Sequence, residues 1–116
     1  MIAGCYAKYR SLGDVWKIDL TSLLETDKTD GLEWQEVKIK GSSFLTRWGH
    51  TSVVFDEKIY IFGGRFCNDL QDIIIVDPTK DTLKSLRVGG ITPKARRRHT
   101  CALIGGCMIT FGGFNG

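Results

Sequence analysis

Arginine and lysine provide the side chains of this sequence that are best suited to chemistry. Arg47 lies three residues before His50, and Arg96 lies three residues before His99 within the run Arg96-Arg97-Arg98. Guanidinium groups form two-pronged hydrogen bonds with carboxylates and phosphates, so this pattern indicates recognition of anions.

Histidine and cysteine do not form a catalytic or metal-binding pattern. His50 and His99 occupy the same position of a repeated motif, which indicates a structural role. An enzyme needs a base, a nucleophile or a metal set that is not part of such a repeat, and we find none. We therefore expect no catalytic residue, no bound metal and no cofactor.

The four cysteines are irregularly spaced and include no C-x-x-C pair, the arrangement that zinc sites favour; they are Cys5, Cys67, Cys101 and Cys107. We expect reduced thiols in a cytoplasmic or nuclear protein. A disulfide or a metal role is the alternative.

An internal sequence repeat places the arginines at equivalent positions. The segment 47–52 matches 96–101, and 61–64 matches 110–113, both at an offset of 49 residues (His50 to His99, Gly63 to Gly112). Residues 14–19 match 72–77 at a longer offset, because a polar insertion at 21–31 lengthens the first unit. Such insertions in repeat proteins are placed in loops.

One complete unit predicts four strands, separated by Asp, Gly and Pro turn signals; they are 51–55, 59–62, 72–76 and 83–88. The first three are β-branched and aromatic runs, which need burial on both faces. The fourth mixes Lys84 and Arg87 with Leu86, as an outer, half-solvated strand does.

These motifs together resemble kelch repeats, in the variety of host-cell-factor-like and Rab-effector kelch proteins. The shared features are Arg-x-x-His at the start of a unit, Gly63-Gly64 after its second strand and Asp-x-x-x-x-Asp around its third. The first unit departs from the pattern, with Gly4-Cys5 in place of a double glycine and with a Trp34 that the second unit lacks.

The resemblance implies an all-β fold, a kelch-type β-propeller fragment of four-stranded antiparallel blades. Residues 1–46 are expected to hold the second half of one blade, 47–95 a complete blade and 96–116 the first half of the next. Propellers close with about 4 to 8 blades. The chain is therefore expected to be part of a longer propeller, or to self-assemble so that one copy's end completes another copy's start.

Loops between antiparallel strands alternate between the two ends of a blade, so the loops two-to-three and four-to-one share one end. We name residues 5–13, 38–48, 65–71 and 89–98 the basic loop face. It carries ten basic residues and one acid, Asp69, whereas the rest of the chain has 6 basic and 12 acidic residues. In kelch proteins these loops usually bind the partner.

We therefore expect a non-enzymatic protein–protein interaction module, a scaffold or substrate adaptor, that binds an acidic or phosphorylated protein segment. The candidate partner-binding residues are Arg10, Arg47, Arg65, Phe66, Asn68, Lys94, Arg96, Arg97 and Arg98. In one alternative the face is only a solvated surface, with Arg47 and one later arginine paired to an acid such as Asp14 or Asp72. In another, the chain is a non-catalytic kelch domain of a larger enzyme, such as a kelch-linked protein phosphatase.

Membranes and nucleic acids are not expected partners. No apolar run approaches the roughly 18 residues of a membrane helix, and no signal peptide is visible. The net charge is only +3, and few aromatic residues alternate with the basic ones, so nucleic-acid binding is not favoured.

Overall fold

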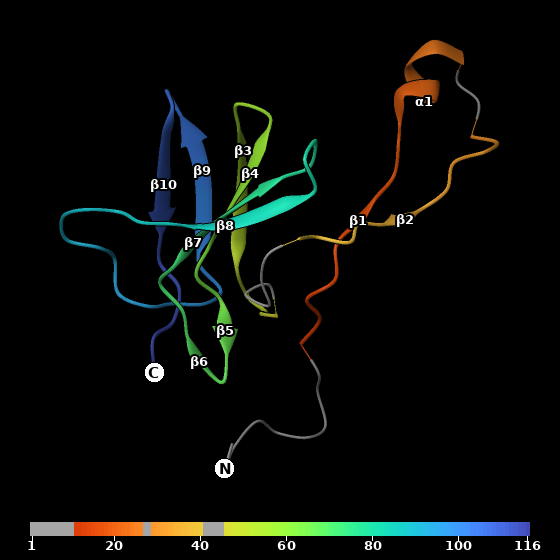
Figure 1. The fold of residues 1–116 in the computed structure, drawn as a ribbon. Helices are drawn as coiled ribbons and strands as arrows, with labels where there is room; N and C mark the ends of the chain where they lie inside the picture. The colour runs from red at the N-terminus through yellow and green to blue at the C-terminus, as the bar shows by residue number, and fades with distance from the viewer. Residues whose placement is uncertain (1–10, 27–28, 41–45) are drawn as a thin grey trace.

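The computed structural model describes residues 11–26, 29–40 and 46–116, and these are mostly strands in antiparallel sheets (Figure 1). This confirms the all-β class and the four-stranded antiparallel unit that the sequence predicts. The elements are β1 (Trp16–Lys17), α1 (Thr21–Thr26), β2 (Gln35–Glu36), β3 (Thr51–Phe55), β4 (Lys58–Phe62), β5 (Arg65–Phe66), β6 (Asn68–Asp69), β7 (Ile73–Asp77), β8 (Thr82–Leu86), β9 (Thr100–Ile104) and β10 (Cys107–Phe111).

The central sheet has four antiparallel strands in the order β3-β4-β7-β8. Its strands differ from the predicted ones by only one or two residues at their ends. Asp56 and Glu57 join β3 to β4 with positive φ angles of 48° and 57°. Two such residues form the mirror-image turn whose twist matches that of the flanking strands.

The core of the sheet lies on β7 and β8. Ile74 is fully buried, and it packs with Val76 and Leu83 against the partly buried Ile59 and Ile61 of β4 and Ile39. The continuous apolar run of β7 is therefore covered, as the sequence predicts for a strand buried on both faces. In β8 only Leu83 is buried and the other four residues are exposed, which fits its role as an outer strand.

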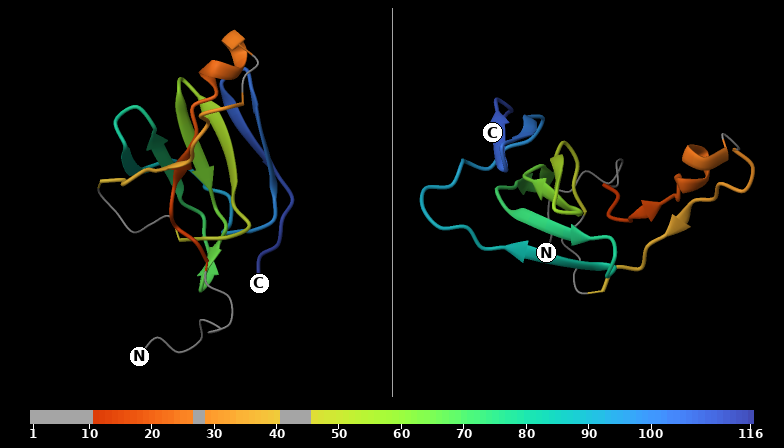
Figure 2. Two further views of the ribbon diagram at one scale, coloured as in Figure 1. Left: turned by 90° about the vertical axis from the view of Figure 1, so that its right-hand side faces the viewer. Right: turned by 90° about the horizontal axis from the view of Figure 1, so that it is seen from above.

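β9 and β10 form a hairpin around Gly105-Gly106, and β9 packs beside β3 (Figures 1 and 2). The outer side of this region is uncovered. Phe111 is 82% exposed, and Val54 and Phe55 of β3 are also exposed. The burial on both faces that the sequence predicts is thus met at β7 but not at these positions.

The leading part of the chain is less regular than predicted. Strands were expected at 15–19 and 34–39, but β1 and β2 are two residues each, with Trp16 opposite Glu36. Here the side chains are largely exposed, so packing does not extend the pairing. The expected strand at 1–5 lies outside the described residues.

The insertion at 21–31 contains the short helix α1 rather than loop alone. The Asp19 carboxylate accepts hydrogen bonds from the Thr21 N–H and hydroxyl, at 2.9 and 2.6 Å, and so fixes the entry to this helix. In the described part of the chain, no helix is long and apolar enough to cross a membrane.

The double glycines adopt the same backbone conformation in both repeats. The φ angles are 60° and 94° at Gly63-Gly64 and 69° and 94° at Gly112-Gly113. A Cβ on Gly63 would lie 2.7 Å from the Arg96 carbonyl oxygen, and one on Gly113 would lie 2.8 Å from the His99 Cβ. Only glycine fits these positions, as the sequence predicted.

The cysteines differ from the expectation of four reduced thiols. Cys67 is disulfide-bonded, whereas Cys101 and Cys107 are free. The spacing of the cysteines gave no sign of this, because a disulfide depends on which loops meet in the fold. Disulfides are rare in reducing compartments, so this bond is evidence against the predicted cytoplasmic or nuclear location. That location stays a prediction.

Candidate partner-binding face

Arg47 is a buried structural residue at the start of the central sheet. It is 5% exposed, and its Nη1 donates to the Gly63 carbonyl oxygen at 2.8 Å. The Nη1 and Nη2 atoms each lie 2.8 Å from one oxygen of the Asp72 carboxylate. The guanidinium therefore ties the segment before β3 to the segments that follow β4 and precede β7, and we remove Arg47 from the partner-binding set.

Arg96 occupies the equivalent position in the next repeat. Its Nη1 donates to the carbonyl oxygen of Gly112, the residue equivalent to Gly63, at 2.9 Å. Its Nε donates to the Lys94 carbonyl oxygen at 3.0 Å. Within the described residues no carboxylate forms a salt bridge with Arg96, so only half of the Arg47 arrangement is repeated.

Backbone hydrogen bonds bring two segments of the basic loop face together. Trp48 and Arg65 exchange N–H···O bonds of 3.1 and 2.8 Å. The Arg96 N–H donates to the Leu70 carbonyl oxygen at 3.0 Å, and the Gly64 N–H donates to the Arg96 carbonyl oxygen at 2.8 Å. The loops 65–71 and 89–98 therefore meet at one end of the central sheet, as predicted from strand alternation.

Asp69 organises the basic residues around it. Its side chain is 8% exposed, and it pairs with Arg97 at 2.5 Å and with Arg65 at 3.4 Å. The Gly116 N–H donates to its second oxygen at 3.1 Å. Burial on its own would raise the pKa of Asp69, but these hydrogen bonds and the two arginine charges outweigh it and lower that pKa.

Arg97 is held between two aromatic rings. Its Cζ lies 4.4 Å from the centroid of Phe114 and 5.6 Å from that of Trp48. Its side chain is only 14% exposed. The cation–π contacts and the Asp69 ion pair thus engage most of this guanidinium. We therefore interpret Arg97 as a residue that holds the surrounding loops in place, with little of its charge available to a partner. Arg98 lies 5.3 Å from the Trp48 ring but remains exposed.

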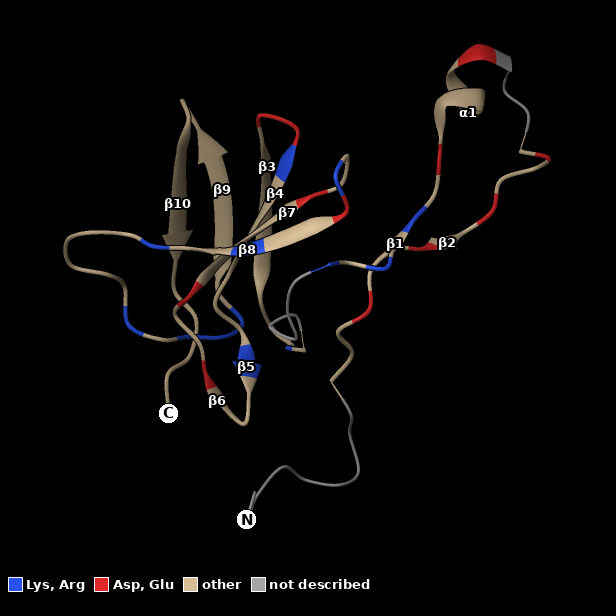
Figure 3. Ribbon diagram, viewed as in Figure 1, with Lys and Arg blue, Asp and Glu red and all other residues tan. Residues whose placement is uncertain are grey.

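The residues that remain available to a partner form what we name the exposed cluster: Arg65, Phe66, Asn68, Lys94 and Arg98. Phe66 is 49% exposed and lies opposite Asn68 in the β5–β6 hairpin. Figure 3 shows basic residues in this hairpin and along the loop that precedes β9. The exposed cluster therefore combines cationic, amide and aromatic groups.

Two other segments of the basic loop face do not contribute to the exposed cluster. Lys38 pairs with Glu36, and the Lys40 N–H donates to the carbonyl oxygen of Asp81, in the turn between β7 and β8. That turn is at the opposite end of the central sheet from β5 and β6 (Figure 1). Arg10, predicted to bind the partner, lies outside the described residues.

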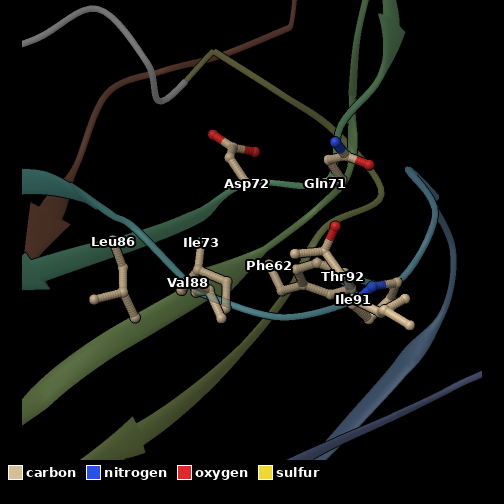
Figure 4. A pocket seen from close by; sticks show the side chains of 9 residues that line it. Phe62, Gln71, Asp72, Ile73, Leu86, Val88, Ile91 and Thr92 are labelled. Atoms are coloured by element: carbon tan, nitrogen blue, oxygen red, sulfur yellow. The ribbon is translucent and has the colours of Figure 1, made fainter.

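An open pocket of about 310 Å³ lies beside the loop 89–98. Its apolar lining comes from Phe62, Ile73, Leu86, Val88 and Ile91 (Figure 4). The side chains of Gln71 and Asp72 lie on one side of these apolar groups. The pocket can therefore receive an apolar side chain near the basic residues.

His99 joins the β9–β10 hairpin to the central sheet. It is 6% exposed, its Nε2 lies 2.6 Å from the Thr51 hydroxyl oxygen, and its ring meets Phe62 edge-on at 5.1 Å between centroids. Burial, followed by the charges of Arg96 and His50, lowers the pKa of His99. A neutral, packed imidazole in this position has a structural role.

Metal ligands do not converge in the part of the chain that the structure describes. Among residues 11–26, 29–40 and 46–116, no three His, Cys, Asp or Glu side chains are placed to hold an ion.

Comparison with known proteins agrees with this geometry. The model of the KLHDC2/KLHL20/DRC7 Kelch-repeats domain family matches residues 1–116. The chain belongs to the kelch-repeat family. The four-stranded β3-β4-β7-β8 sheet is then the blade unit of a kelch propeller.

Several curated kelch relatives are longer proteins. Kelch domain-containing protein 3 of Bos taurus is 33% identical over 72 residues, which cover 59% of this chain and 18% of that protein. The human protein of that name gives the same identity and coverage. The Rho GTPase-activating protein gacHH of Dictyostelium discoideum is 27% identical over 92 residues, 72% of this chain and 6% of that protein. The chain thus spans less than a fifth of these relatives.

Sequence reasoning offered the pairing of Arg47 with Asp72 as an alternative, which the structure confirms, but it missed how strongly Arg65 and Arg97 are engaged. The sequence identified Asp69 as the single acid of the basic loop face, and this was the one signal that it pairs with neighbouring arginines. The sequence did not reveal that the ring of Phe114 also contacts the Arg97 guanidinium, because Phe114 lies outside the residues of the basic loop face.

Proposed function

We propose that this kelch chain is a non-enzymatic protein-binding module whose exposed cluster binds an acidic or phosphorylated protein segment. The observation that carries the proposal is the exposure of Lys94 and Arg98 beside Arg65, whose side chain is 31% exposed. The one acid of this surface, Asp69, is buried and already shared by Arg65 and Arg97. Two positive charges thus oppose the single negative charge of Asp69, which leaves this surface positive.

Charge separation along the central sheet supports this proposal. The turns at the other end of the sheet carry four acidic residues, Asp56, Glu57, Asp77 and Asp81, against the two basic residues Lys58 and Lys80, and Figure 3 shows both signs there with the acidic residues in excess. A field that is positive at one end and negative at the other orients an anionic partner and raises its association rate. Such steering weakens as salt is added.

The exposed cluster also suggests what the partner segment contains. Arg98 and Arg65 suit bidentate contact with carboxylate or phosphate oxygens. The half-exposed Phe66 ring and the apolar pocket beside Ile91 add surface for a hydrophobic side chain. We therefore propose a segment with several acidic residues and one neighbouring apolar residue.

Charge reversal tests the proposal. Lys94→Glu with Arg98→Glu should weaken binding of a fluorescent Glu-rich peptide at least tenfold, whereas the Gln-rich counterpart should bind neither protein. Lys80→Glu with Lys84→Glu is the matched control, because it changes the net charge equally on exposed residues outside the basic loop face. Fluorescence anisotropy at two salt concentrations measures both effects. Equal losses in the two double variants, or affinity independent of salt, would contradict the proposal.

A second candidate is that the chain is the kelch portion of a larger signalling protein. Two relatives carry such names, the Rho GTPase-activating protein gacHH and a probable serine/threonine-protein kinase of Dictyostelium discoideum, the latter 31% identical over 87 residues. In that case the exposed cluster would recruit a partner to an enzyme. A GTPase-activation or kinase assay of the 116 residues alone should then show no activity.

A further inference from the structure

The loop between β8 and β9 leaves the body of the fold. Figures 1 and 2 show it extending away from the sheets after β8. Every residue from 84 to 94 is exposed. Within the described part of the chain, residues 87–95 make no backbone–backbone hydrogen bond, and the next such bond runs from the Arg96 N–H to the Leu70 carbonyl oxygen at 3.0 Å. A segment of this kind can bind in the groove of another protein without first being unfolded.

The sequence of this loop favours an extended and adaptable backbone. Pro93 restricts the residue before it, Thr92, to an extended conformation. Gly89 and Gly90 have open space where a Cβ would be placed, and the φ of Gly90 is 77°. The loop therefore presents Thr92 in extended form, next to a glycine pair that lets the segment adjust to a bound protein.

Thr92 differs from the other exposed threonine of the central repeat that lies in a connecting segment, Thr79. The Thr79 hydroxyl donates to the Asp77 carboxylate at 2.7 Å, and the Thr79 N–H donates to the same oxygen at 3.1 Å. No such bond holds Thr92 among the described residues. Thr92 is also the one serine or threonine of the sequence that precedes a proline. Its hydroxyl is therefore accessible, unoccupied and in a distinctive sequence context.

We propose that Thr92 is a phosphorylation site for a proline-directed protein kinase, and that the phosphate switches off the exposed cluster. In the transfer, the Thr92 hydroxyl oxygen bonds to the γ-phosphorus of a nucleoside triphosphate, and the bond from that phosphorus to the bridging oxygen breaks. The hydroxyl proton passes to a base of the kinase, and the nucleoside diphosphate leaves. The effect on the exposed cluster rests on the proposed function, whereas the modification itself does not.

The charge of the loop explains why a phosphate acts as a switch. Residues 89–98 include four basic residues and no acid. A phosphothreonine carries a charge of about −1.5 to −2 at neutral pH. The cations of the exposed cluster are Arg65, Lys94 and Arg98, and Lys94 is only two residues from Thr92. One phosphate therefore offsets much of the positive charge that attracts an acidic segment.

The pocket beside the loop adds a second effect in the same direction. Thr92 lines this pocket together with Gln71 and Asp72. Figure 4 shows the Thr92 hydroxyl oxygen on the side of the pocket where these two polar side chains lie. A phosphate there places a strongly hydrated anion at the entrance for an apolar side chain of the partner. Binding of that side chain then requires the costly removal of water from the phosphate.

Phosphate mapping on the folded chain tests the site. The chain is incubated with a purified proline-directed kinase of the mitogen-activated class and Mg-ATP, and the products are analysed by mass spectrometry. We expect one phosphate, at Thr92, and kcat/KM within about threefold of that for the synthetic peptide 87–96, because the loop needs no unfolding. Thr92→Ala should take up no phosphate, and Thr79 is the internal control. Phosphate at Thr79 in place of Thr92, or a folded chain slower than the peptide by more than about tenfold, would overturn the proposal.

The purified phosphoprotein tests the switch. Its affinity for the fluorescent Glu-rich peptide should be lower by about tenfold at low salt, with an unchanged circular dichroism spectrum. Kinase-treated Thr92→Ala protein should bind like the untreated wild type. A phosphoprotein with wild-type affinity would overturn the switch. An unmodified chain that does not bind the peptide would contradict the proposed function instead, and the phosphate mapping would still decide whether Thr92 is the modified residue.

Discussion

The guanidinium of Arg47 forms a bidentate ion pair with the carboxylate of Asp72, 25 residues further along the chain, with both N–O distances at 2.8 Å. The pair fastens the segment before β3 to the start of β7. The central sheet therefore depends on a buried cation with a structural role, whereas Lys94 and Arg98 of the same basic loop face are exposed.

Loss of Arg47 should destabilise the fold. Arg47→Met removes the cation and leaves the Asp72 carboxylate and the Gly63 carbonyl without their shared donor, which should lower the free energy of unfolding by about 3 kcal/mol. Urea denaturation followed by circular dichroism measures this. Lys58→Met is the control, because its pair with Asp56 is solvent-exposed and should contribute nothing measurable. Equal effects of the two substitutions would contradict a structural role for the Arg47 pair.

Gly63 should not tolerate a side chain. Gly63→Ala places a Cβ 2.7 Å from the Arg96 carbonyl oxygen on a backbone with φ of 60°, which should cost about 2 kcal/mol or more. Gly89→Ala meets nothing within 4 Å and should leave stability unchanged or slightly raised. Thermal or urea unfolding of the two variants checks the difference. A stable Gly63→Ala protein would show that the two loops do not approach this closely.

The neutral state of His99 should make stability depend on pH. Because burial lowers the pKa of His99 below its ordinary value of 6.5, the unfolded chain takes up a proton at higher pH than the folded protein does. The free energy of unfolding should therefore fall as the pH drops below about 6.5. His99→Gln should reduce this dependence. An unchanged slope in urea titrations from pH 7 to pH 5 would show that His99 is not buried as described.

Asp69 should change stability in the same direction as His99, but in the acid range. Its pKa is lowered from 3.8 in the folded protein, so its stabilising effect is complete above that pH and is lost as the pH falls through the folded pKa. Acid unfolding of Asp69→Asn should therefore be shallower below pH 4 than that of the wild type. Asp30→Asn, at an exposed position of the insertion, should follow the wild type. Matching curves for all three proteins would contradict the arginine pairing of Asp69.

The sequence predicted the elements whose signals are local and repeated. The Gly63-Gly64 and Gly112-Gly113 pairs, the turn at Asp56-Glu57 and the apolar run of β7 each determine their own conformation, so the four-stranded sheet followed from them. Strand lengths near β1 could not be predicted, because exposed residues there receive no packing that would extend the pairing.

The sequence predicted only some of the contacts between distant loops, among them the pairing of Arg47 with Asp72 that it offered as an alternative. The repeat predicted that Arg47 and Arg96 are equivalent, but not that only Arg47 has its acid among the described residues. Lys40 was assigned to the basic loop face by its order between strands, yet its backbone is bound at Asp81. The disulfide of Cys67 likewise depends on how the loops are placed.

The central claim is that the exposed cluster binds anionic protein segments, and chemical-shift mapping tests it most directly. A ¹⁵N-labelled chain is titrated with the Glu-rich peptide, and amide shifts are followed by NMR. The account predicts that the largest shifts occur at residues 65–70 and 94–98, with little change at the acidic turns 56–57 and 78–81. Shifts centred on those turns would contradict the account. The absence of shifts at peptide concentrations near 1 mM would also contradict it, because a Kd above that value corresponds to a binding free energy of less than about 4 kcal/mol.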